Sequence, residues 1–336
     1  MLRSAIKPAV LVTGAAGYLG SHATLALLDA GYPVIAIDNL STGFRGAVDR
    51  RAIFHEGDIE NGSFVRSLMQ FQQVGAVMHF AGSADPDESV RDPLKYYRNN
   101  TCASRSLIEN AIACGVPHFV YSTTAAIYGC PVDVPVPESA ERHPLNPHAM
   151  SKLLSEAILA DAAAAHGLSY GIVRWLDAAG ADPDGRSGPS ATSNHHMIAM
   201  ALEVALGKRD HVTIAGIDLP TPDGSTVRDY VHVSDLADAH VAVLEGLLAE
   251  PARNLCVNCG YGRGFSTLEI LDAVERVTNV RIERVHTAPA PHEPPVLVTD
   301  NRMILETLDW QPRFADLEEI VRSTYQWELG SRAALG

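Results

Sequence analysis

The first half of the chain alternates short, almost wholly apolar runs with segments of helical periodicity. The apolar runs cover residues 9–12, 33–37, 76–80, 118–122 and 170–175, with a shorter one at 53–54. The helical segments cover residues 18–30, 63–72, 104–114 and 151–166. Apolar strands that alternate with helices are typical of a parallel sheet covered on both faces. The pattern therefore predicts an α/β fold whose main part is a doubly wound parallel-sheet Rossmann domain.

The pattern changes near Gly180. The next 14 residues, 181–194, are polar and rich in Gly, Pro and Ser, a composition typical of active-site loops. Beyond them we expect helices at 197–206, 233–248, 267–278 and 317–328, a strand at 212–215 and a Pro-rich loop at 286–295. We predict a Rossmann domain of residues 1–180 and a smaller mixed α/β substrate-binding lobe of residues 181–336, with some exchange of chain between the two.

Composition and charge narrow the class of protein. The chain has 336 residues, of which 46% are hydrophobic and 20% charged, so it can bury a large core. Its net charge of -14 argues against the broad basic face that non-specific nucleic-acid binding requires. We find no cleavable leader pattern and no uncharged run of about 18 residues, and therefore expect no membrane contact. Five scattered cysteines do not make a disulfide framework. We expect a cytoplasmic protein.

A glycine-rich turn gives the first chemical signal. Gly14, Gly17 and Gly20 follow the first predicted strand and open the first predicted helix. Such a turn lets a pyrophosphate approach the amides at the helix N-terminus. Asp38, at the end of the next strand, would accept hydrogen bonds from an adenosine ribose and repel a 2′-phosphate, which favours NAD over NADP. The alternative is a helix-packing turn with an ordinary strand-end aspartate.

Nine segments extend this signal along the chain. In order they are TGAAGYLGSH, IDNLSTG, EGDI, HFAG, DESVRDPLKYYRNN, VYSTTAAIYG, SKLLSE, RWLDAAGA and TPDGSTVRDYVHVSDLADAH. Together they resemble the extended short-chain dehydrogenase/reductase family and, within it, the UDP-glucose 4-epimerases. The spacing of the three glycines is the form typical of short-chain dehydrogenases. The resemblance covers nearly the whole chain.

The resemblance implies an NAD site, a nucleotide-sugar site and a homodimer. The residues it implies at the NAD site are Gly14, Gly17, Tyr18, Leu19, Gly20, Asp38, Asn39, Asp58, Ile59, Phe80, Ala81, Gly82, Asn99, Ser122 and Lys152. The segment 89–114 matches the family's subunit-pairing helix. We therefore expect a dimer formed by the helices around 89–114 and 146–166.

The catalytic constellation of the family is present with one replacement. The resemblance implies a Ser/Thr at Thr124 and a lysine at Lys152, but the tyrosine of the family's Y-x-x-x-K is His148 here. The spacing i, i+4 places His148 and Lys152 on one helical face. Imidazole, with an ordinary pKa of about 6.5, is mostly neutral at pH 7 and can accept a sugar hydroxyl proton. The competing hypothesis is that His148 only fills the space of the missing phenol. Tyr128 matches a packing residue of the family.

The substrate residues depart further from the family. Asp177 replaces an amide, His195 and His196 replace an Asn-Asn pair, and Ala290 and Leu297 stand where an arginine and a tyrosine are expected. Arg228 is retained and is our candidate phosphate clamp, because a guanidinium can donate two hydrogen bonds to phosphate oxygens. The alternative for Arg228 is a surface ion pair with Asp229.

These features predict an NAD-dependent nucleotide-sugar epimerase that oxidises a sugar carbinol transiently and returns the hydride to the opposite face. The altered residues indicate an atypical substrate, with a nucleotide other than UDP, such as GDP, or with an enlarged sugar. Two alternatives stay open: a catalytically silent binding protein that regulates a partner, and a UDP-glucose/UDP-galactose 4-epimerase proper. Cys256 and Cys259 have a metal-like spacing but lack a second pair, so we expect core packing and no metal.

Overall fold

The computed structural model describes residues 7–189, 196–250, 253–289 and 293–333, with side chains described as far as residue 330. Its main element is a sheet of seven strands in the order β11-β6-β5-β4-β1-β2-β3, and every neighbouring pair is parallel. The strands are β1 (Ala9–Thr13), β2 (Val34–Asp38), β3 (Ile53–Glu56), β4 (Val74–His79), β5 (His118–Thr124), β6 (Ser169–Trp175) and β11 (Leu255–Asn258). The predicted doubly wound α/β fold is confirmed.

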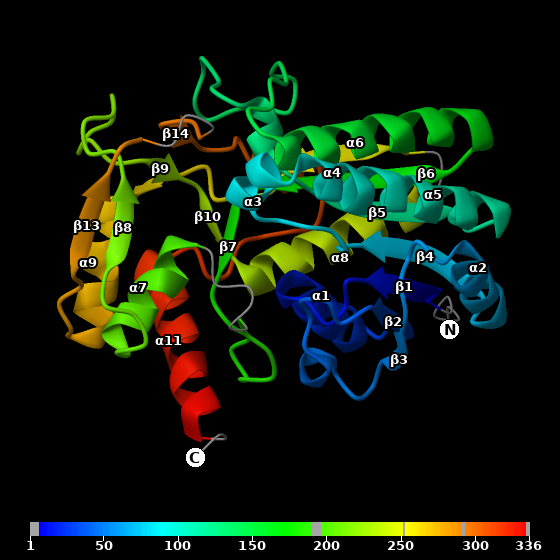
Figure 1. Cartoon of the computed structure of the whole chain (residues 1–336). Helices are drawn as coiled ribbons and strands as arrows, with labels where there is room; N and C mark the ends of the chain where they lie inside the picture. Colours follow the sequence, from blue (N-terminus) through cyan, green and yellow to red (C-terminus); the bar gives the residue numbers. More distant parts are fainter. Residues whose placement is uncertain (1–6, 190–195, 251–252, 290–292, 334–336) are drawn as a thin grey trace.

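Helices cover both faces of this sheet (Figure 1). Helices α1 (Tyr18–Asp29) and α8 (Val233–Ala249) lie on one face, and α2 (Gly62–Phe71), α5 (Ala103–Ala113) and α6 (Pro147–His166) lie on the other. Val10 and Val12 pack in the core on the α1/α8 side, whereas Leu11, which lies between them, packs in the core on the other side. Because side chains alternate along a strand, one apolar run supplies both cores.

Two elements return to the main sheet from the second half of the chain. The sequence pattern placed the helix at 233–248 in the smaller lobe, although it also predicted some exchange of chain between the two parts; the structure corrects the placement of this helix. Helix α8 packs against α1, with Leu244 and Leu247 in the same core as Leu27. Strand β11 then pairs with β6 along the sheet edge. Periodicity identifies an apolar face of a helix but not the surface that covers it, so the boundary near residue 180 stays a prediction.

The smaller unit has its own core. Helices α7 (Met197–Ala205), α9 (Thr267–Thr278) and α11 (Leu317–Ala333) meet beside a parallel pair, β8 (Val212–Ala215) and β13 (Arg284–Thr287). Leu202, Leu271 and Ile320 are buried there. The remaining elements are short: β7 (Asp177–Ala179), β9 (Val227–Arg228), β10 (Tyr230–His232), β12 (Phe265–Ser266), β14 (Val296–Leu297) and α10 (Arg302–Thr307). Within the described ranges, no helix is both long and apolar enough to span a bilayer.

Helix α6 begins earlier than the periodicity indicated. Pro147 occupies its first position, and the Asn146 side chain caps it by accepting a hydrogen bond from the Ala149 backbone N–H at 2.9 Å. His148 therefore lies in the first turn of α6 and Lys152 in the second. Upstream, α3 (Pro86–Arg91) and α4 (Pro93–Tyr96) lead into a π-helical turn (Tyr97–Cys102) that continues as α5.

Candidate active site

The glycine turn after β1 is tightly packed. Gly14 has φ +68°, and a Cβ there would lie 2.7 Å from the Ala81 backbone nitrogen in the loop after β4. A Cβ on Gly20 would collide with the Gly14 carbonyl oxygen. Only glycine allows this fold of the turn. Gly17 caps α1 without a side-chain hydrogen bond, and no acid lies in the first turn. The first amides of α1 therefore suit an anion such as a pyrophosphate.

Asp38, the acid at the end of β2, keeps free acceptor positions that suit an adenosine ribose. The Asp38 carboxylate accepts one hydrogen bond per oxygen, from the Ala16 N–H at 2.9 Å and from the Leu40 N–H at 2.7 Å. Each oxygen keeps a lone pair for a further donor, such as a ribose hydroxyl. Asn39 donates to Asp58 Oδ2 at 2.9 Å, so the segments that follow β2 and β3 are in contact. Together with the glycine cradle, this acceptor set fits NAD.

Two other residues implied at this site make structural contacts. The Tyr18 hydroxyl donates to the Gly180 carbonyl at 2.5 Å, and Ile59 is buried in the core on the α5/α6 side of the sheet. Neither contact tests a role in cofactor binding, which stays a prediction for both.

Lys152 reaches from α6 to the ends of the central strands. Its Nζ donates to the Ser122 carbonyl on β5 at 3.3 Å and would lie 3.5 Å from a Cβ on Gly82. Ser122 Oγ accepts from Trp175 Nε1 at 2.9 Å. Burial lowers the pKa of Lys152 to about 8, opposed by the negative charge of Glu156. The structure thus brings together three residues that the sequence predicted for the cofactor site.

His148 lies one turn before Lys152, buried at 8% exposure. Burial and the nearby charge of Lys152 lower the pKa of His148 to about 3, so its imidazole is neutral at pH 7, as expected. Its Nδ1 is buried and has no hydrogen-bond partner among the described residues. Thr124 ends β5 two residues after Ser122, hence on the same strand face, and its Oγ1 accepts from the Ala126 N–H at 3.1 Å.

A buried polar network that the sequence reasoning missed connects this region. Thr13 Oγ1 and His79 Nδ1 are 2.6 Å apart, and His79 Nε2 is 2.8 Å from Ser104 Oγ. These residues stand at the ends of β1 and β4 and on α5. Polar residues at the carboxyl ends of apolar strands are the signal that could have found them.

Asn100 is a second missed residue and joins two parts of the site. Its side-chain amide accepts from the Ser83 N–H at 2.7 Å and donates to the Ser83 carbonyl at 3.0 Å and to Ser151 Oγ at 3.0 Å. Asn99, which the resemblance implied, donates to Ser83 Oγ at 3.0 Å. Asn100 therefore fixes the loop that follows Phe80, Ala81 and Gly82 to α6.

Two of the predicted substrate residues lie on short strands, Asp177 on β7 and Arg228 on β9. Arg228 pairs with Glu293, with Nη2 and Oε2 3.3 Å apart. The alternative of an Arg228–Asp229 ion pair was wrong, because Asp229 points away and accepts from Thr299 Oγ1 at 2.7 Å. Asp177 aligns with Tyr230 across β7 and β10, and burial raises the pKa of its carboxyl to about 6, opposed by the charge of Arg228.

Of the other predicted substrate positions, His196 and Leu297 lie in the described part of the chain. His196 caps α7, and its Nδ1 accepts from the Ala199 N–H at 3.4 Å. Leu297 is fully buried on β14 in a cluster with Tyr128, next to the partly buried Leu153 of α6. His195 and Ala290 lie outside the described residues.

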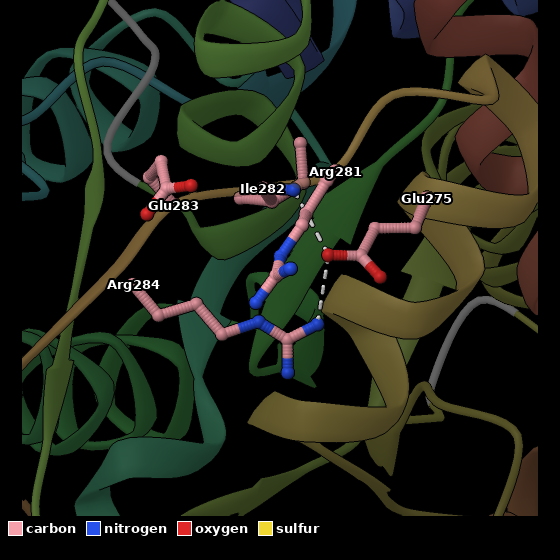
Figure 2. A pocket seen from close by; sticks show the side chains of 5 residues that line it. All are labelled: Glu275, Arg281, Ile282, Glu283 and Arg284. Atoms are coloured by element: carbon pink, nitrogen blue, oxygen red, sulfur yellow. Dashed lines mark hydrogen bonds and ion pairs between the residues drawn. The ribbon is translucent and has the colours of Figure 1, made fainter.

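A surface cavity of about 390 Å³ lies elsewhere, beside α9 (Figure 2). Glu275 in its wall accepts from the Ile282 N–H at 2.9 Å and from Arg284 Nη2 at 3.0 Å, and none of the predicted site residues lines it. Cys256 lies in β11, and Cys259 follows it as a buried core residue, as predicted. In the described part of the chain, no group of three or more His, Cys, Asp or Glu side chains could hold a metal.

Comparison with known proteins agrees with this geometry. Residues 10–260 match the model of the NAD dependent epimerase/dehydratase family. The chain is 45% identical over 334 residues to a UDP-glucose 4-epimerase of Azospirillum brasilense, covering 99% of this chain and 96% of that one.

Solved structures of similar proteins cover nearly the whole chain as well. One is UDP-glucose 4-epimerase from Brucella ovis in complex with NAD, with TM-score 0.91, 39% identity and coverage of 95% of this chain and 98% of that one. Another is UDP-glucose-4-epimerase from Stenotrophomonas maltophila with bound NAD and formylated UDP-arabinopyranose, with TM-score 0.93, 33% identity and coverage of 97% and 99%.

The chain belongs to the NAD-dependent epimerase/dehydratase family. Within that family it is an isomerase, an epimerase that uses NAD as its cofactor.

Proposed function

We propose that this epimerase inverts one carbinol carbon of a nucleotide sugar, and that His148 and Lys152 act at that carbon. The observation that carries the proposal is the buried face of α6, where a neutral imidazole and a lysine with a lowered pKa stand one turn apart beside Ser122 and Gly82. Relatives and solved structures that cover nearly the whole chain and are named as UDP-glucose 4-epimerases support the substrate class.

When bound, NAD would supply the hydride acceptor for transient oxidation of the carbinol and the hydride donor for reduction from the opposite face of the sugar. His148 exchanges the hydroxyl proton through Nε2, because Nδ1 is buried. Accepting that proton requires the tautomer that carries hydrogen on Nδ1. The low pKa makes this imidazole a weak base, so we expect it to take the proton only as the hydride leaves. Thr124 orients the same hydroxyl.

We propose an atypical nucleotide sugar as the preferred substrate. The carboxylate of Asp177 would repel a diphosphate while ionised, and the buried Leu297 cannot hydrogen-bond a nucleotide. A solved relative that holds a formylated pentose nucleotide supports tolerance for a modified sugar in this architecture. UDP-glucose and UDP-galactose are the second candidates, favoured by the relatives' names.

Incubation with UDP-, GDP- and dTDP-sugars followed by NMR of the anomeric protons tests both statements. We expect interconversion of one epimer pair, with a transient NADH absorbance. Sole turnover of UDP-galactose and UDP-glucose would contradict the atypical substrate but keep the reaction. Bound NAD with no turnover and no absorbance change on any sugar would instead favour the silent binding protein.

We also propose a homodimer through the helices around 89–114 and 146–166, of which α3, α4 and α6 carry exposed apolar side chains. Val90, Leu94 and Leu154 are 49%, 77% and 40% exposed on these helices, which pack together. Exposed apolar side chains on helices that pack together favour a partner surface. Leu94→Asp combined with Leu154→Asp should give a monomer by light scattering, while Phe71→Asp on the more distant α2 should not. We place the protein in the reducing cytoplasm, because its five cysteines are free.

A further inference from the structure

The chain contains four lysines, and three of them form ion pairs. Lys7 pairs with Glu245 at 3.1 Å, Lys95 with Glu88 at 2.5 Å and Lys208 with Glu328 at 2.5 Å. Each of these lysines lies near the surface. Lys152 is buried and pairs with no described carboxylate, although burial makes an unpaired charge costly.

A carboxylate is nevertheless within reach of Lys152. Glu156 follows it by four residues on α6, the spacing at which lysine and glutamate side chains meet on a helix. Both oxygens of Glu156 are instead bound by Arg174 of β6, with Nε to Oε1 at 3.2 Å and Nη2 to Oε2 at 2.6 Å. The two side chains are 3% and 4% exposed, so this bidentate pair is fully buried.

Other contacts hold Arg174 in this position. Its Nη1 donates to the Tyr128 hydroxyl at 2.9 Å, and Tyr128 in turn donates to Asn258 Oδ1 at 2.8 Å. The Lys152 ammonium points the other way, toward the Ser122 carbonyl, and lies 5.1 Å from the centroid of the Tyr121 ring.

We infer that Arg174 is a positioning residue: by binding Glu156, it keeps that carboxylate from pairing with Lys152 and leaves the ammonium directed at Ser122 and Gly82. The inference rests on the proposed function, in which Lys152 serves the cofactor and the reacting sugar. Without Arg174, Glu156 would be a buried carboxylate with no partner, and Lys152 would be the nearest cation on its own helix. The ammonium would then turn along α6, away from the cofactor loop.

The Lys152 titration tests this directly, because selective 13Cε labelling of lysine gives four NMR signals to assign. The titratable and charged groups around Lys152 are His148 and Glu156 on α6, Tyr121 on β5, His79 on β4 and Arg174 on β6. We expect Arg174→Gln to raise the pKa of Lys152 by about one pH unit or more, since a free carboxylate now faces it. Adding Glu156→Gln to that variant should restore the wild-type titration. Tyr128→Phe is the matched control, because it removes another partner of Arg174 and should leave Lys152 unchanged.

Two functional measurements accompany the titration. NAD retention and turnover should fall about tenfold in Arg174→Gln and return to within about threefold of wild type in the double variant. An unchanged Lys152 pKa in Arg174→Gln, or a double variant that does not recover, overturns the inference. If Arg174→Gln does not fold, the double variant still decides: with both charges removed it must keep the wild-type titration. Because the titration needs no substrate, it can succeed even if the proposed epimerisation fails.

Discussion

The ring of Tyr96 packs edge-on against the imidazole of His148, with centroids 6.2 Å apart and planes at 83°. Tyr96 is fully buried, and its hydroxyl donates to Glu88 Oε2 at 2.9 Å. Nδ1 of His148 has no hydrogen-bond partner in the described structure, so the aromatic contact with Tyr96 is one restraint on the orientation of the imidazole. This contact at the start of α6 therefore helps to set the orientation of the imidazole that we propose exchanges the proton.

Substitution of His148 tests its role as the proton-exchanging group. His148→Phe keeps a planar ring in the same space but removes both nitrogens, so turnover should fall by about 10²- to 10⁴-fold while NAD stays bound. His148→Gln, which keeps a polar group but is no base, should behave alike. We expect turnover, measured by the NMR assay, to fall by this factor. We expect the content of bound NAD to stay at the wild-type level. Full activity of His148→Phe would mean that another group is the base.

The Tyr96 contact predicts a difference between two substitutions at one position. Tyr96→Phe keeps the ring and should change turnover by less than about threefold, whereas Tyr96→Leu frees the imidazole and should lower kcat about tenfold with KM nearly unchanged. Thermal unfolding of both variants controls for lost core packing. Equal kcat values for the two variants would show that the ring contact does not position His148.

Buried histidines predict how stability depends on pH. Burial lowers the pKa of five of them from 6.5 to about 3 or 4: His22, His79, His148, His232 and His240. The unfolded chain therefore binds more protons than the folded one below pH 6.5, and the free energy of unfolding should fall as the pH drops from about 6.5 toward 4.

Buried acids act in the opposite sense over part of this range, and burial raises the pKa of Glu138 and Asp238 above their usual values. Burial raises the pKa of Asp177 and Asp229 to about 6, so between about pH 4 and 6 these two favour the folded state as the pH falls. Five histidines with larger shifts outweigh them. Urea unfolding at pH 7, 6 and 5 should show a steady fall in the free energy of unfolding. In His240→Gln, the free energy of unfolding should depend less steeply on pH. A flat profile would mean that the histidines are not buried as neutral rings.

The Arg228–Glu293 ion pair predicts a gain of affinity. If Arg228 binds the substrate diphosphate, Glu293 competes for the same guanidinium, because Nη2 and Oε2 are 3.3 Å apart. Glu293→Gln should lower KM a few-fold and Arg228→Gln should raise it by about tenfold or more, with both effects weaker at high salt. An unchanged KM in Arg228→Gln would remove this residue from the substrate site.

The Asp38 carboxylate predicts cofactor preference. Asp38→Asn removes the charge that repels a 2′-phosphate and turns one acceptor toward the Ala16 or Leu40 N–H into a donor. We expect weaker NAD retention and a smaller preference over NADP, read from the rise in melting temperature that each nucleotide produces. Asn39→Ala, at the next position, should leave the preference for NAD intact. If Asp38→Asn still excludes NADP, residues other than Asp38 determine the preference for NAD over NADP.

The sequence by itself determined six of the seven strands of the main sheet, its first helices and the glycine turn after the first strand. Apolar runs such as 9–12 and the spacing from Gly14 to Gly20 are local patterns, because they involve residues that are close in sequence. Such patterns predict a strand or a turn without knowledge of the residues that pack against it. The i, i+4 spacing of His148 and Lys152 belongs to the same class, because a helix fixes it.

Only the tertiary structure decided which distant side chains meet. It returned α8 and β11 to the main sheet, joined Ser83 to α6 through Asn100, paired Arg174 with Glu156, and packed Tyr96 on His148. Each of these contacts joins two segments that form their own helix, strand or loop without it. The hydrophobic pattern of either segment therefore does not predict the contact. Buried polar groups and apolar faces must find partners, but the partner is chosen by the packing of the whole chain.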